Sequence, residues 1–233
     1  MLLEYDNHCP GTIFSEPDFE MTLDEAYELQ WTVAQLRLRR GEIVAGYKIG
    51  CVSESVQRQL GVNEPVFGHV WASEIYAEGV SLRLDRFASL AIEGEVAVRL
   101  ADDGQSIASV FPVIELHNRV LRRPPGAVEL VANNAIHAGI VKPEESTQFR
   151  LEMETITVFR DGSALGAAPA TAFPGGPLES VERVQRHLQA RGQRLAPGQI
   201  VLTGTPLPLF DVLSPQQIRV RASDGQEVSA TFG

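Results

Sequence analysis

The sequence predicts an α+β fold in which a mostly antiparallel β-sheet is rolled or closed on itself, with a few peripheral helices. Three observations lead to this class. Ten short apolar segments are punctuated by glycine and proline, three segments have helical periodicity, and the two kinds do not alternate regularly. Because regular alternation of strands and helices is typical of a doubly wound parallel sheet, that class is excluded.

The clearest predicted helix covers residues 22–40. A Thr-x-x-Glu capping box, formed by Thr22 and Glu25, opens an amphipathic stretch that ends just before a glycine. Shorter patterns predict a second helix over residues 53–61 and a third over residues 177–190, each followed or ended by a glycine.

Nearly all of the remaining chain is predicted to form short strands. No linker, repeat or low-complexity tract divides the 233 residues, so we expect one domain, with residues 1–20 as an arm without periodicity and residues 44–233 as a β-rich core. The expected strands are Val44–Gly50, Val66–Trp71, Val80–Leu84, Ala91–Leu100, Val110–His117, Ile136–Lys142, Met153–Phe159, Gln199–Thr203, Ile218–Ala222 and Val228–Phe232.

The net charge narrows the classes of partner. The chain has 20 Lys and Arg against 30 Asp and Glu, a formal net charge of −10 at pH 7, which speaks against a nucleic acid or an anionic membrane. Cys9 and Cys51 lack the number and spacing of a disulfide framework or a zinc site. Because Glu4 and Asp6 stand where a signal peptide carries positive charge, and no stretch of about 18 apolar residues occurs, we expect a cytoplasmic protein.

Two carboxylates are expected side by side on one strand. In Ala91–Leu100, strand alternation sends Glu93 and Glu95 to the same face, about 7 Å apart. Glu115 lies among apolar neighbours on another strand, where a buried carboxylate needs an ionic partner or a metal. Three carboxylates without a cysteine suit a hard cation such as Mg²⁺ or Mn²⁺, and a salt-bridged Glu115 beside a solvated Glu-x-Glu is the alternative.

Two further segments offer polar groups. Lys48 lies between apolar residues in Gly46–Gly50, and its ammonium would pair with a substrate carboxylate or the acidic cluster, or else extend to water. The segment Leu130–Gly139 has the composition of a loop that presents amides and His137 to a pocket, although Asn-rich turns are also common without function.

Seven segments occur together in an order and spacing typical of one enzyme superfamily. They are Gly46-Tyr-Lys-Ile-Gly50, Ser53–Leu60, Leu60-Gly-Val-Asn-Glu-Pro-Val-Phe-Gly68, Ile92-Glu-Gly-Glu95, Pro112-Val-Ile-Glu115, Ala132-Asn-Asn-Ala135 and Leu202-Thr-Gly204. With them the chain, from about Leu23 to its C-terminus, resembles the fumarylacetoacetate hydrolase superfamily. The most similar branch is that of 2-oxopent-4-enoate hydratases and 4-oxalocrotonate decarboxylases.

This resemblance implies a β-rich mixed roll that holds a divalent cation, usually Mg²⁺ or Mn²⁺. Carried over by position, the metal ligands are Glu93, Glu95 and Glu115. The resemblance also implies a small 2-oxo acid substrate whose carboxylate and keto oxygen bind that cation, which would stabilise an enolate. Residues 44–233 would then be the metal-binding core of a single catalytic domain over residues 1–233.

The same resemblance assigns other site residues. Lys48 matches the active-site lysine of the family and would hold the substrate or move a proton. Asn134 and Thr203 lie in matching segments and would bind the substrate. The distal group of the substrate would be recognised by an arginine, for which Arg119, Arg122 and Arg123 are available.

Two positions depart from the family pattern. Val66 stands where the hydratases have an aspartate, and Ile136 stands where they have a serine after Asn-Ala. His69, His117 and His137 fall close to the same segments, and each is a candidate general acid or base that would replace the missing polar groups. A structural role for each histidine is the alternative.

Three functions follow from these features. The first is a metal-dependent hydratase or decarboxylase of aromatic ring-cleavage catabolism that acts through an enolate. The second is a C–C hydrolase of an acylpyruvate such as fumarylpyruvate or maleylpyruvate, which would release pyruvate. The third is a metal-binding homologue without catalysis. The resemblance also implies a homo-oligomer, a dimer or larger.

Overall fold

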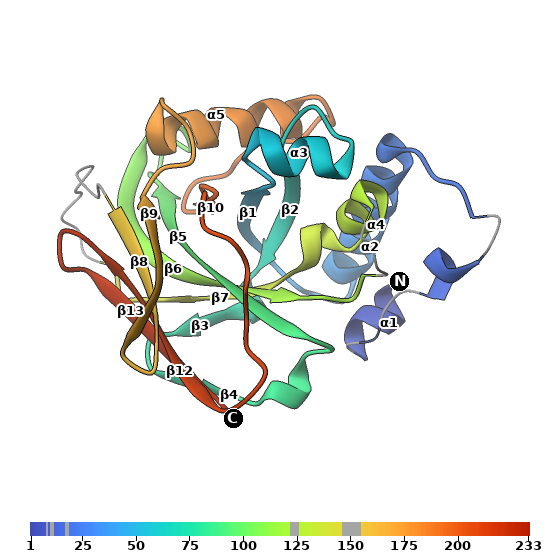
Figure 1. Ribbon diagram of the computed structural model, residues 1–233. Coiled ribbons are helices and arrows are strands. Elements are labelled where there is room, and N and C mark those ends of the chain that lie inside the picture. Colours follow the sequence, from blue (N-terminus) through green and yellow to red (C-terminus); the bar gives the residue numbers. More distant parts are fainter. Residues whose placement is uncertain (8, 10–11, 17–18, 122–125, 146–154) are drawn as a thin grey trace.

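Two mixed β-sheets build the centre of the molecule (Figure 1). The computed structural model describes all residues except 8, 10–11, 17–18, 122–125 and 146–154. The larger sheet has the order β2 (Val66–Trp71), β1 (Val44–Gly50), β10 (Ile200–Leu202), β5 (Leu90–Leu100), β6 (Ile107–Asn118), β7 (His137–Lys142) and β3 (Ile75–Ala77), with β11 (Phe210–Asp211) paired to β5. The smaller sheet has the order β4 (Val80–Leu82), β13 (Glu227–Phe232), β12 (Gln216–Ala222), β8 (Thr155–Arg160) and β9 (Ser163–Pro169).

Most strand pairs are antiparallel, and the parallel ones are β1 with β10, β3 with β7 and β13 with β4. The predicted α+β class and mixed roll are confirmed. Where the sheets meet, β5 packs against β8 and β12, because Gly94 lets the side chains of Val158 and Val220 approach its backbone. The main core lies there, around fully buried side chains such as Ile92 and Val96.

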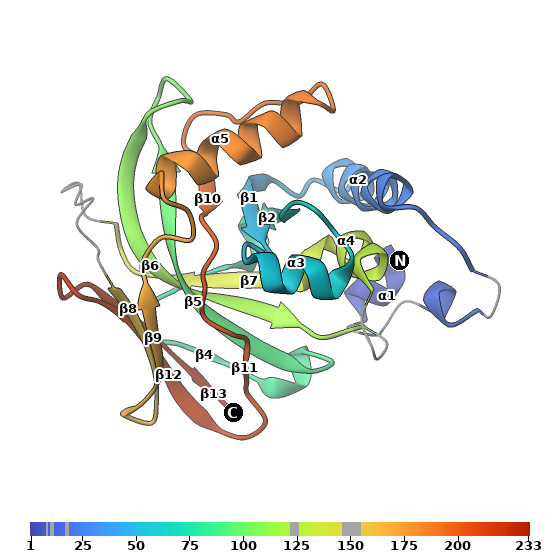
Figure 2. The same ribbon diagram turned by 45° about the horizontal axis from the view of Figure 1, so that its top comes forward.

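Helices cover the upper and right-hand sides of the larger sheet in Figure 1, and the tilted view of Figure 2 separates them. All three predicted helices are confirmed, as α2 (Leu23–Arg39), α3 (Glu54–Leu60) and α5 (Gly176–Gln189). The capping box is present, since the Thr22 hydroxyl accepts from the Glu25 amide and the Glu25 carboxylate accepts from the Thr22 amide. Gln30 is a buried residue of α2, and its side-chain amide donates to the carbonyls of Phe67 and Val131, at 2.9 and 2.8 Å. These bonds fix α2 to β2 and to the short helix α4 (Ala127–Ala132).

The N-terminal segment is more ordered than its sequence indicates. It contains α1 (Leu2–Asp6) and a 3-10 turn, Thr12–Ser15. Tyr5 donates a hydrogen bond to Glu74, and its ring lies 4.6 Å from the Arg37 guanidinium of α2. The part of the segment around α1 therefore lies against α2 and the 3-10 turn, Ala72–Glu74, that follows β2.

Some elements are absent from the sequence-based prediction. The short strands β3 and β11 and the helix α4 were not predicted, nor was β9, whose Ala and Gly residues have low strand propensity. The strand predicted from Met153 is observed from Thr155, and Met153 itself lies outside the described residues. Ile136, predicted to begin a strand, instead belongs to a left-handed turn before β7. No helix in the part of the chain that the structure describes is long and apolar enough to cross a membrane.

Candidate active site

The strands β5 and β6 bring the predicted carboxylates together. Glu93 of β5 is the direct cross-strand partner of Glu115 of β6, and Glu95 lies two residues further on the same face of β5. The residue between the two glutamates must be small, because a Cβ at Gly94 would lie 2.5 Å from a Val158 methyl group. The Glu-Gly-Glu segment thus presents both carboxylates on one face while its glycine admits the second sheet.

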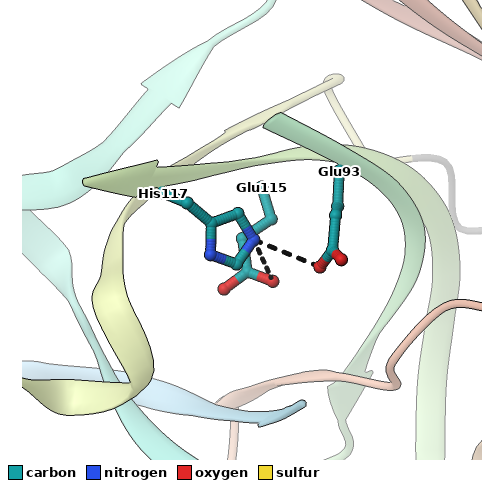
Figure 3. Close-up of side chains that lie close together, drawn as sticks. All are labelled: Glu93, Glu115 and His117. Carbon is teal, nitrogen blue, oxygen red and sulfur yellow. Dashed lines mark hydrogen bonds and ion pairs between the residues drawn. The ribbon is translucent and has the colours of Figure 1, made fainter. Parts of the chain in front are cut away.

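His117 completes a compact group with two of these carboxylates (Figure 3). Its Nε2 lies 3.2 Å from Oε2 of Glu93 and 3.3 Å from Oε2 of Glu115. One ligand atom from each of the three residues falls within 4.8 Å of the others, which is suitable for a metal ion. Burial lowers the pKa of His117, but the neighbouring carboxylates of Glu115 and Glu93 outweigh this effect and raise it.

Glu115 is the most heavily partnered carboxylate of the site. Its Oε1 lies 2.7 Å from Nδ1 of His137 and 3.3 Å from Nζ of Lys48, and its Oε2 contacts His117. Burial raises the pKa of Glu115, yet the positive charges of His117 and Lys48 hold it well below its usual range. The predicted alternative of a salt-bridged Glu115 is therefore also present in the structure.

Glu95 has the opposite environment. Its side chain is buried, and neither carboxylate oxygen makes a hydrogen bond of ordinary geometry among the described residues, although the Gly204 backbone lies near enough to favour the charged form weakly. Burial together with the charges of Glu115 and Glu93 raises its pKa well above the usual range. A buried carboxylate with so little support is costly unless it meets a cation, so these three glutamates suit a hard divalent ion, although Glu95 is not in the compact group that Glu93 and Glu115 form with His117.

Lys48 lies on the same face of the larger sheet as the carboxylates. In the register it stands opposite Leu202 of β10, which in turn stands opposite Ala97 of β5. Its ammonium folds over Gly50, where a Cβ would lie 2.9 Å from Nζ and 3.7 Å from a methyl group of Val66. Val66, at the position where the family pattern has a carboxylate, therefore places a methyl group at the edge of the same space over Gly50.

The side chains of Asn134 and Thr203 are engaged with the backbone. Asn134 accepts from the amide of His69 at 2.7 Å and donates to its carbonyl at 2.9 Å, so it holds the turn before β7 against β2. The Thr203 hydroxyl donates to the carbonyl of Val96 at 2.7 Å. Both predicted substrate-binding residues are near the site, but their side-chain hydrogen bonds have a structural role.

His69 is not part of the cluster. It stands opposite Tyr47 in the register of β1 and β2, whereas Lys48 stands opposite Gly68, so the two side chains project from opposite faces of the sheet. The His69 ring stacks on Trp31 and Trp71, with centroid distances of 5.7 and 5.8 Å. The structure therefore does not bring His69 together with the other candidate catalytic residues. Neighbouring strands can present adjacent sequence motifs to opposite faces, which the motifs alone do not reveal.

A strained turn positions His137. Asn134, Ala135 and Ile136 all have left-handed backbone angles, with φ of 56°, 50° and 53°. Such a run is costly for Ala and especially for a β-branched residue, and it marks a segment held in place by its surroundings. The predicted polar loop was expected to present His137, but the turn itself was not foreseen, and Asn134 was its only sequence signal.

The arginines proposed for the distal group are not placed around the carboxylates by the structure. Arg119 forms an ion pair with Asp211 at 2.6 Å. Arg122 and Arg123 lie outside the described residues. Recognition of the distal end of a substrate therefore remains a prediction.

Curated relatives resemble the chain over most of its length. A "2-keto-4-pentenoate hydratase" of Burkholderia vietnamiensis is 30% identical over 239 aligned positions, which cover 96% of this chain and 88% of the relative. A "4-oxalocrotonate decarboxylase" of Pseudomonas putida is 25% identical over 228 positions, covering 91% of this chain and 86% of the relative. No family model matches the sequence.

Solved structures share the fold. The 4-oxalocrotonate decarboxylase from Pseudomonas putida G7, complexed with magnesium and adipate, superposes with a TM-score of 0.87 at 22% identity, covering 99% of this chain and 94% of that one. A fumarylpyruvate hydrolase from Pseudomonas aeruginosa, in complex with Mn²⁺ and pyruvate, gives a TM-score of 0.64 at 16% identity, with 80% and 88% covered. Solved structures thus bear out the fold that the resemblance to the fumarylacetoacetate hydrolase superfamily implies. Because Glu93 and Glu115 pair across β5 and β6 and the alignment with the curated relative is nearly complete, the chain belongs to the 2-keto-4-pentenoate hydratase family.

Proposed function

We propose that this protein is a divalent-metal-dependent enzyme of aromatic ring-cleavage catabolism that acts on a small 2-oxo acid through an enolate, as a hydratase or a decarboxylase. One observation carries the proposal. Three carboxylates, Lys48 and two histidines converge on one face of β5, β6, β1 and β7, and a carboxylate among them has no partner in the described protein. Such a site has little structural use but suits the chemistry of the relatives.

The cation would be held by Glu93, Glu95 and Glu115, which we propose as the metal ligands. When bound, a divalent cation supplies positive charge that neutralises a substrate carboxylate and stabilises negative charge on the 2-oxo oxygen. Carboxylate oxygens suit Mg²⁺ or Mn²⁺. The solved structures of similar fold are complexes with magnesium, calcium or Mn²⁺. These facts support a divalent metal in this protein and leave Mg²⁺ and Mn²⁺ as the proposed ions.

Lys48 would bind the substrate and hold a proton near its reacting carbons. Its ammonium is buried and lies 3.3 Å from Glu115. A fixed positive charge at this place can attract the carboxylate of a 2-oxo acid, and its proton can be shared with the carbon chain as the enolate forms or collapses. The apolar side chain of Val66 leaves Lys48 without the carboxylate that the family pattern provides.

His137, which like Lys48 contacts Glu115, is the proposed acid–base residue. Its Nδ1 is paired with Glu115 at 2.7 Å, while Nε2 is buried without a partner among the described residues. A carboxylate at Nδ1 fixes the ring and leaves Nε2 to accept or donate a proton. His117 is the second candidate, since it also lies in the cluster.

The same pairing of His137 with a carboxylate is the observation that favours the second function, a C–C hydrolase. A histidine fixed by a carboxylate can activate a water molecule, and a hydrolase would direct that water at the distal carbonyl of an acylpyruvate. A hydratase would instead add water at the far end of a conjugated dienoate. The two functions differ in whether pyruvate leaves.

Ultraviolet absorbance separates these functions. The purified protein is mixed with Mg²⁺ or Mn²⁺ and, in parallel, with 2-hydroxypenta-2,4-dienoate, 4-oxalocrotonate and the acylpyruvates, while released pyruvate and CO₂ are measured. Metal-dependent loss of the dienoate without pyruvate, or CO₂ release from 4-oxalocrotonate, is the expected result. Pyruvate from an acylpyruvate would replace the proposal with a hydrolase, and no turnover with any substrate would favour the non-catalytic homologue.

A homo-oligomer and a cytoplasmic location are further proposals, supported by the resemblance and by the composition. Analytical ultracentrifugation of the purified protein would test the first, and a monomer at micromolar concentration would contradict it.

A further inference from the structure

His117 occupies an unusual place for a structural histidine. Its Nε2 is almost equally distant from one oxygen of Glu93 and one oxygen of Glu115, at 3.2 and 3.3 Å (Figure 3). The ring is buried, and its other nitrogen has no hydrogen-bond partner among the described residues. Among the described residues, the polar contacts of the His117 ring are therefore all to carboxylates of the proposed metal site.

We infer that His117 is a fourth, nitrogen ligand of the divalent cation, and that this site prefers Mn²⁺ or a similar first-row transition ion to Mg²⁺. The inference rests on the proposed function only in that both need a cation at these carboxylates. It goes beyond the three-carboxylate site that the resemblance implies.

The spacing of the donor atoms supports this assignment. In an octahedral site with bonds of about 2.2 Å, neighbouring ligand atoms stand about 3.1 Å apart. Nε2 of His117 stands close to that distance from both carboxylate oxygens, so the three atoms can ligate one ion with little movement. The pairing of β5 with β6 fixes this arrangement. His117 stands opposite Ala91 and Glu115 stands opposite Glu93, and these two cross-strand pairs are neighbours on the same face of the sheet.

Glu95 gives a second, independent indication that an ion belongs here. Its two buried oxygens have no hydrogen-bond partner among the described residues, and it projects from the same face of β5 as Glu93. A cation that binds Glu93, Glu115 and His117 would relieve this charge. Four protein ligands would leave two positions of a six-coordinate ion, enough for the two oxygens of a 2-oxo acid.

A nitrogen ligand from His117 would determine whether the site prefers Mn²⁺ or Mg²⁺. Mg²⁺ is a hard ion that strongly favours oxygen, whereas imidazole suits first-row transition ions. A site of three carboxylates alone would discriminate weakly between Mg²⁺ and Mn²⁺. With His117 as a ligand, we expect Mn²⁺ to bind at least about tenfold more tightly than Mg²⁺.

Two measurements on the protein test the inference without relying on turnover. Pulsed EPR of bound Mn²⁺ detects coupling to a directly bound nitrogen nucleus, and calorimetry gives the affinities for Mn²⁺ and Mg²⁺. We expect nitrogen coupling in the wild type, its loss in His117→Gln, and a fall of about tenfold in the preference for Mn²⁺ in that variant. Gln retains a polar group that can bond both glutamates, so the variant separates ligation from simple hydrogen bonding.

Two other histidine variants serve as controls. His69→Phe, on the opposite face of the sheet, and His137→Gln, which contacts Glu115 through Oε1, should both keep the nitrogen coupling. Absence of coupling in the wild type overturns the inference, and this result does not depend on the folding of any variant. Loss of coupling in His137→Gln instead of His117→Gln also overturns it.

Failure of the inference is distinguishable from failure of the proposed function. Turnover of the dienoate with Mn²⁺ bound but without nitrogen coupling would refute the His117 ligand and leave the hydratase function in place. Nitrogen coupling with no turnover of any substrate would support the ligand and refute the proposed activity.

Discussion

Lys48 is one of only two lysines in the chain, and its place beside Glu115 makes it the most specific test of catalysis at the level of a single residue. Replacing it with Met keeps a side chain of similar length but removes the charge and the proton. We expect Lys48→Met to lower kcat by about 100-fold or more, because a positioned proton donor contributes that much. Steady-state kinetics with the best substrate of the absorbance assay would measure the loss.

The other lysine provides the matched control. Lys142 forms an ion pair with Glu145 at 2.8 Å, on the partly exposed side of β7. Lys142→Met should keep kcat within about twofold, since surface charge pairs contribute little. Equal losses in the two variants, or full activity of Lys48→Met, would remove Lys48 from the mechanism.

Glu95 allows a prediction in which stability and metal binding change in opposite directions. Its buried carboxylate makes no hydrogen bond of ordinary geometry among the described residues, and burial together with the charges of Glu115 and Glu93 raises its pKa. Glu95→Gln should therefore raise the free energy of unfolding in EDTA by about 1–3 kcal/mol. The stabilisation by added Mn²⁺, measured as the shift in Tm, should decrease sharply because a ligand is lost.

Glu145→Gln is the control, because it should change the free energy of unfolding in EDTA in the opposite direction. The Glu145 carboxylate bonds Arg99 and lies 2.8 Å from the Lys142 ammonium, and although burial raises its pKa, these partners lower it to about 2. Its neutralisation should lower stability in EDTA and leave the metal-induced shift unchanged. If Glu95→Gln also destabilised the metal-free protein, the orphaned charge would be the wrong explanation of its environment.

At the level of elements, the contact between β5 and the second sheet depends on Gly94. A Cβ there would lie 2.5 Å from a methyl group of Val158 and 3.0 Å from one of Val220. Gly94→Ala should lower the free energy of unfolding by about 1–3 kcal/mol through overpacking, and should weaken metal binding because Glu93 and Glu95 flank it. Chemical denaturation and calorimetry would measure the two effects.

A double-mutant cycle tests the cause. If the clash with Val158 is responsible, then Gly94→Ala combined with Val158→Ala should be more stable than the sum of the single changes predicts, by about 1 kcal/mol or more. Strict additivity would show that the two side chains do not meet as the structure places them.

The left-handed turn before β7 is the second element with a clear test. Asn134→Ala removes both side-chain hydrogen bonds to the His69 backbone and places Ala at a φ of 56°. We expect it to lower the free energy of unfolding by about 2–3 kcal/mol. Asn133→Ala, which loses one bond to the carbonyl of Glu129 at 2.8 Å, should lower it by no more than about 1 kcal/mol. Equal effects in urea denaturation would contradict the role of Asn134 as the clamp of this turn.

At the level of the whole molecule, the sequence predicts the elements whose signals are local. The capping box of Thr22 defines the start of α2, and alternation defines β5 and the face that bears Glu93 and Glu95. The strand β9 was missed because its small residues carry no strand signal, and pairing with β8 supplies its stability instead. Tertiary contacts of this kind cannot be inferred from a local pattern.

The sequence predicts which carboxylates come together at the site better than it predicts which histidines join them. Glu93 and Glu115 become partners only through the register of β5 and β6, which strand periodicity does not give and the resemblance does not state, since it implies only a shared metal. His117 and His137 join them, whereas His69 projects from the other face. The sequence also does not reveal the structural use of Asn134, whose amide satisfies backbone groups of His69 that would otherwise be buried without a partner.

The aromatic surroundings of His69 make the stability of the whole molecule sensitive to acid. Burial lowers the pKa of His69 to about 4, against about 6.5 in the unfolded chain. Between these values the unfolded state binds a proton that the folded state does not, so stability is fully present above about pH 6.5 and is lost as the pH falls toward 4. For this residue alone, the free energy of unfolding should fall by about 2 kcal/mol from pH 7 to pH 5.

His69→Phe isolates that contribution, because Phe can keep the stacking on Trp31 and Trp71 but cannot be protonated. Urea denaturation at pH 7 and pH 5 should give the variant a smaller loss of stability than the wild type, by about 2 kcal/mol. Its kcat should stay unchanged, since His69 and Lys48 lie on opposite faces of the sheet. A variant with the same pH dependence as the wild type would show that His69 is not buried as a neutral ring, and a large loss of kcat would return it to the active site.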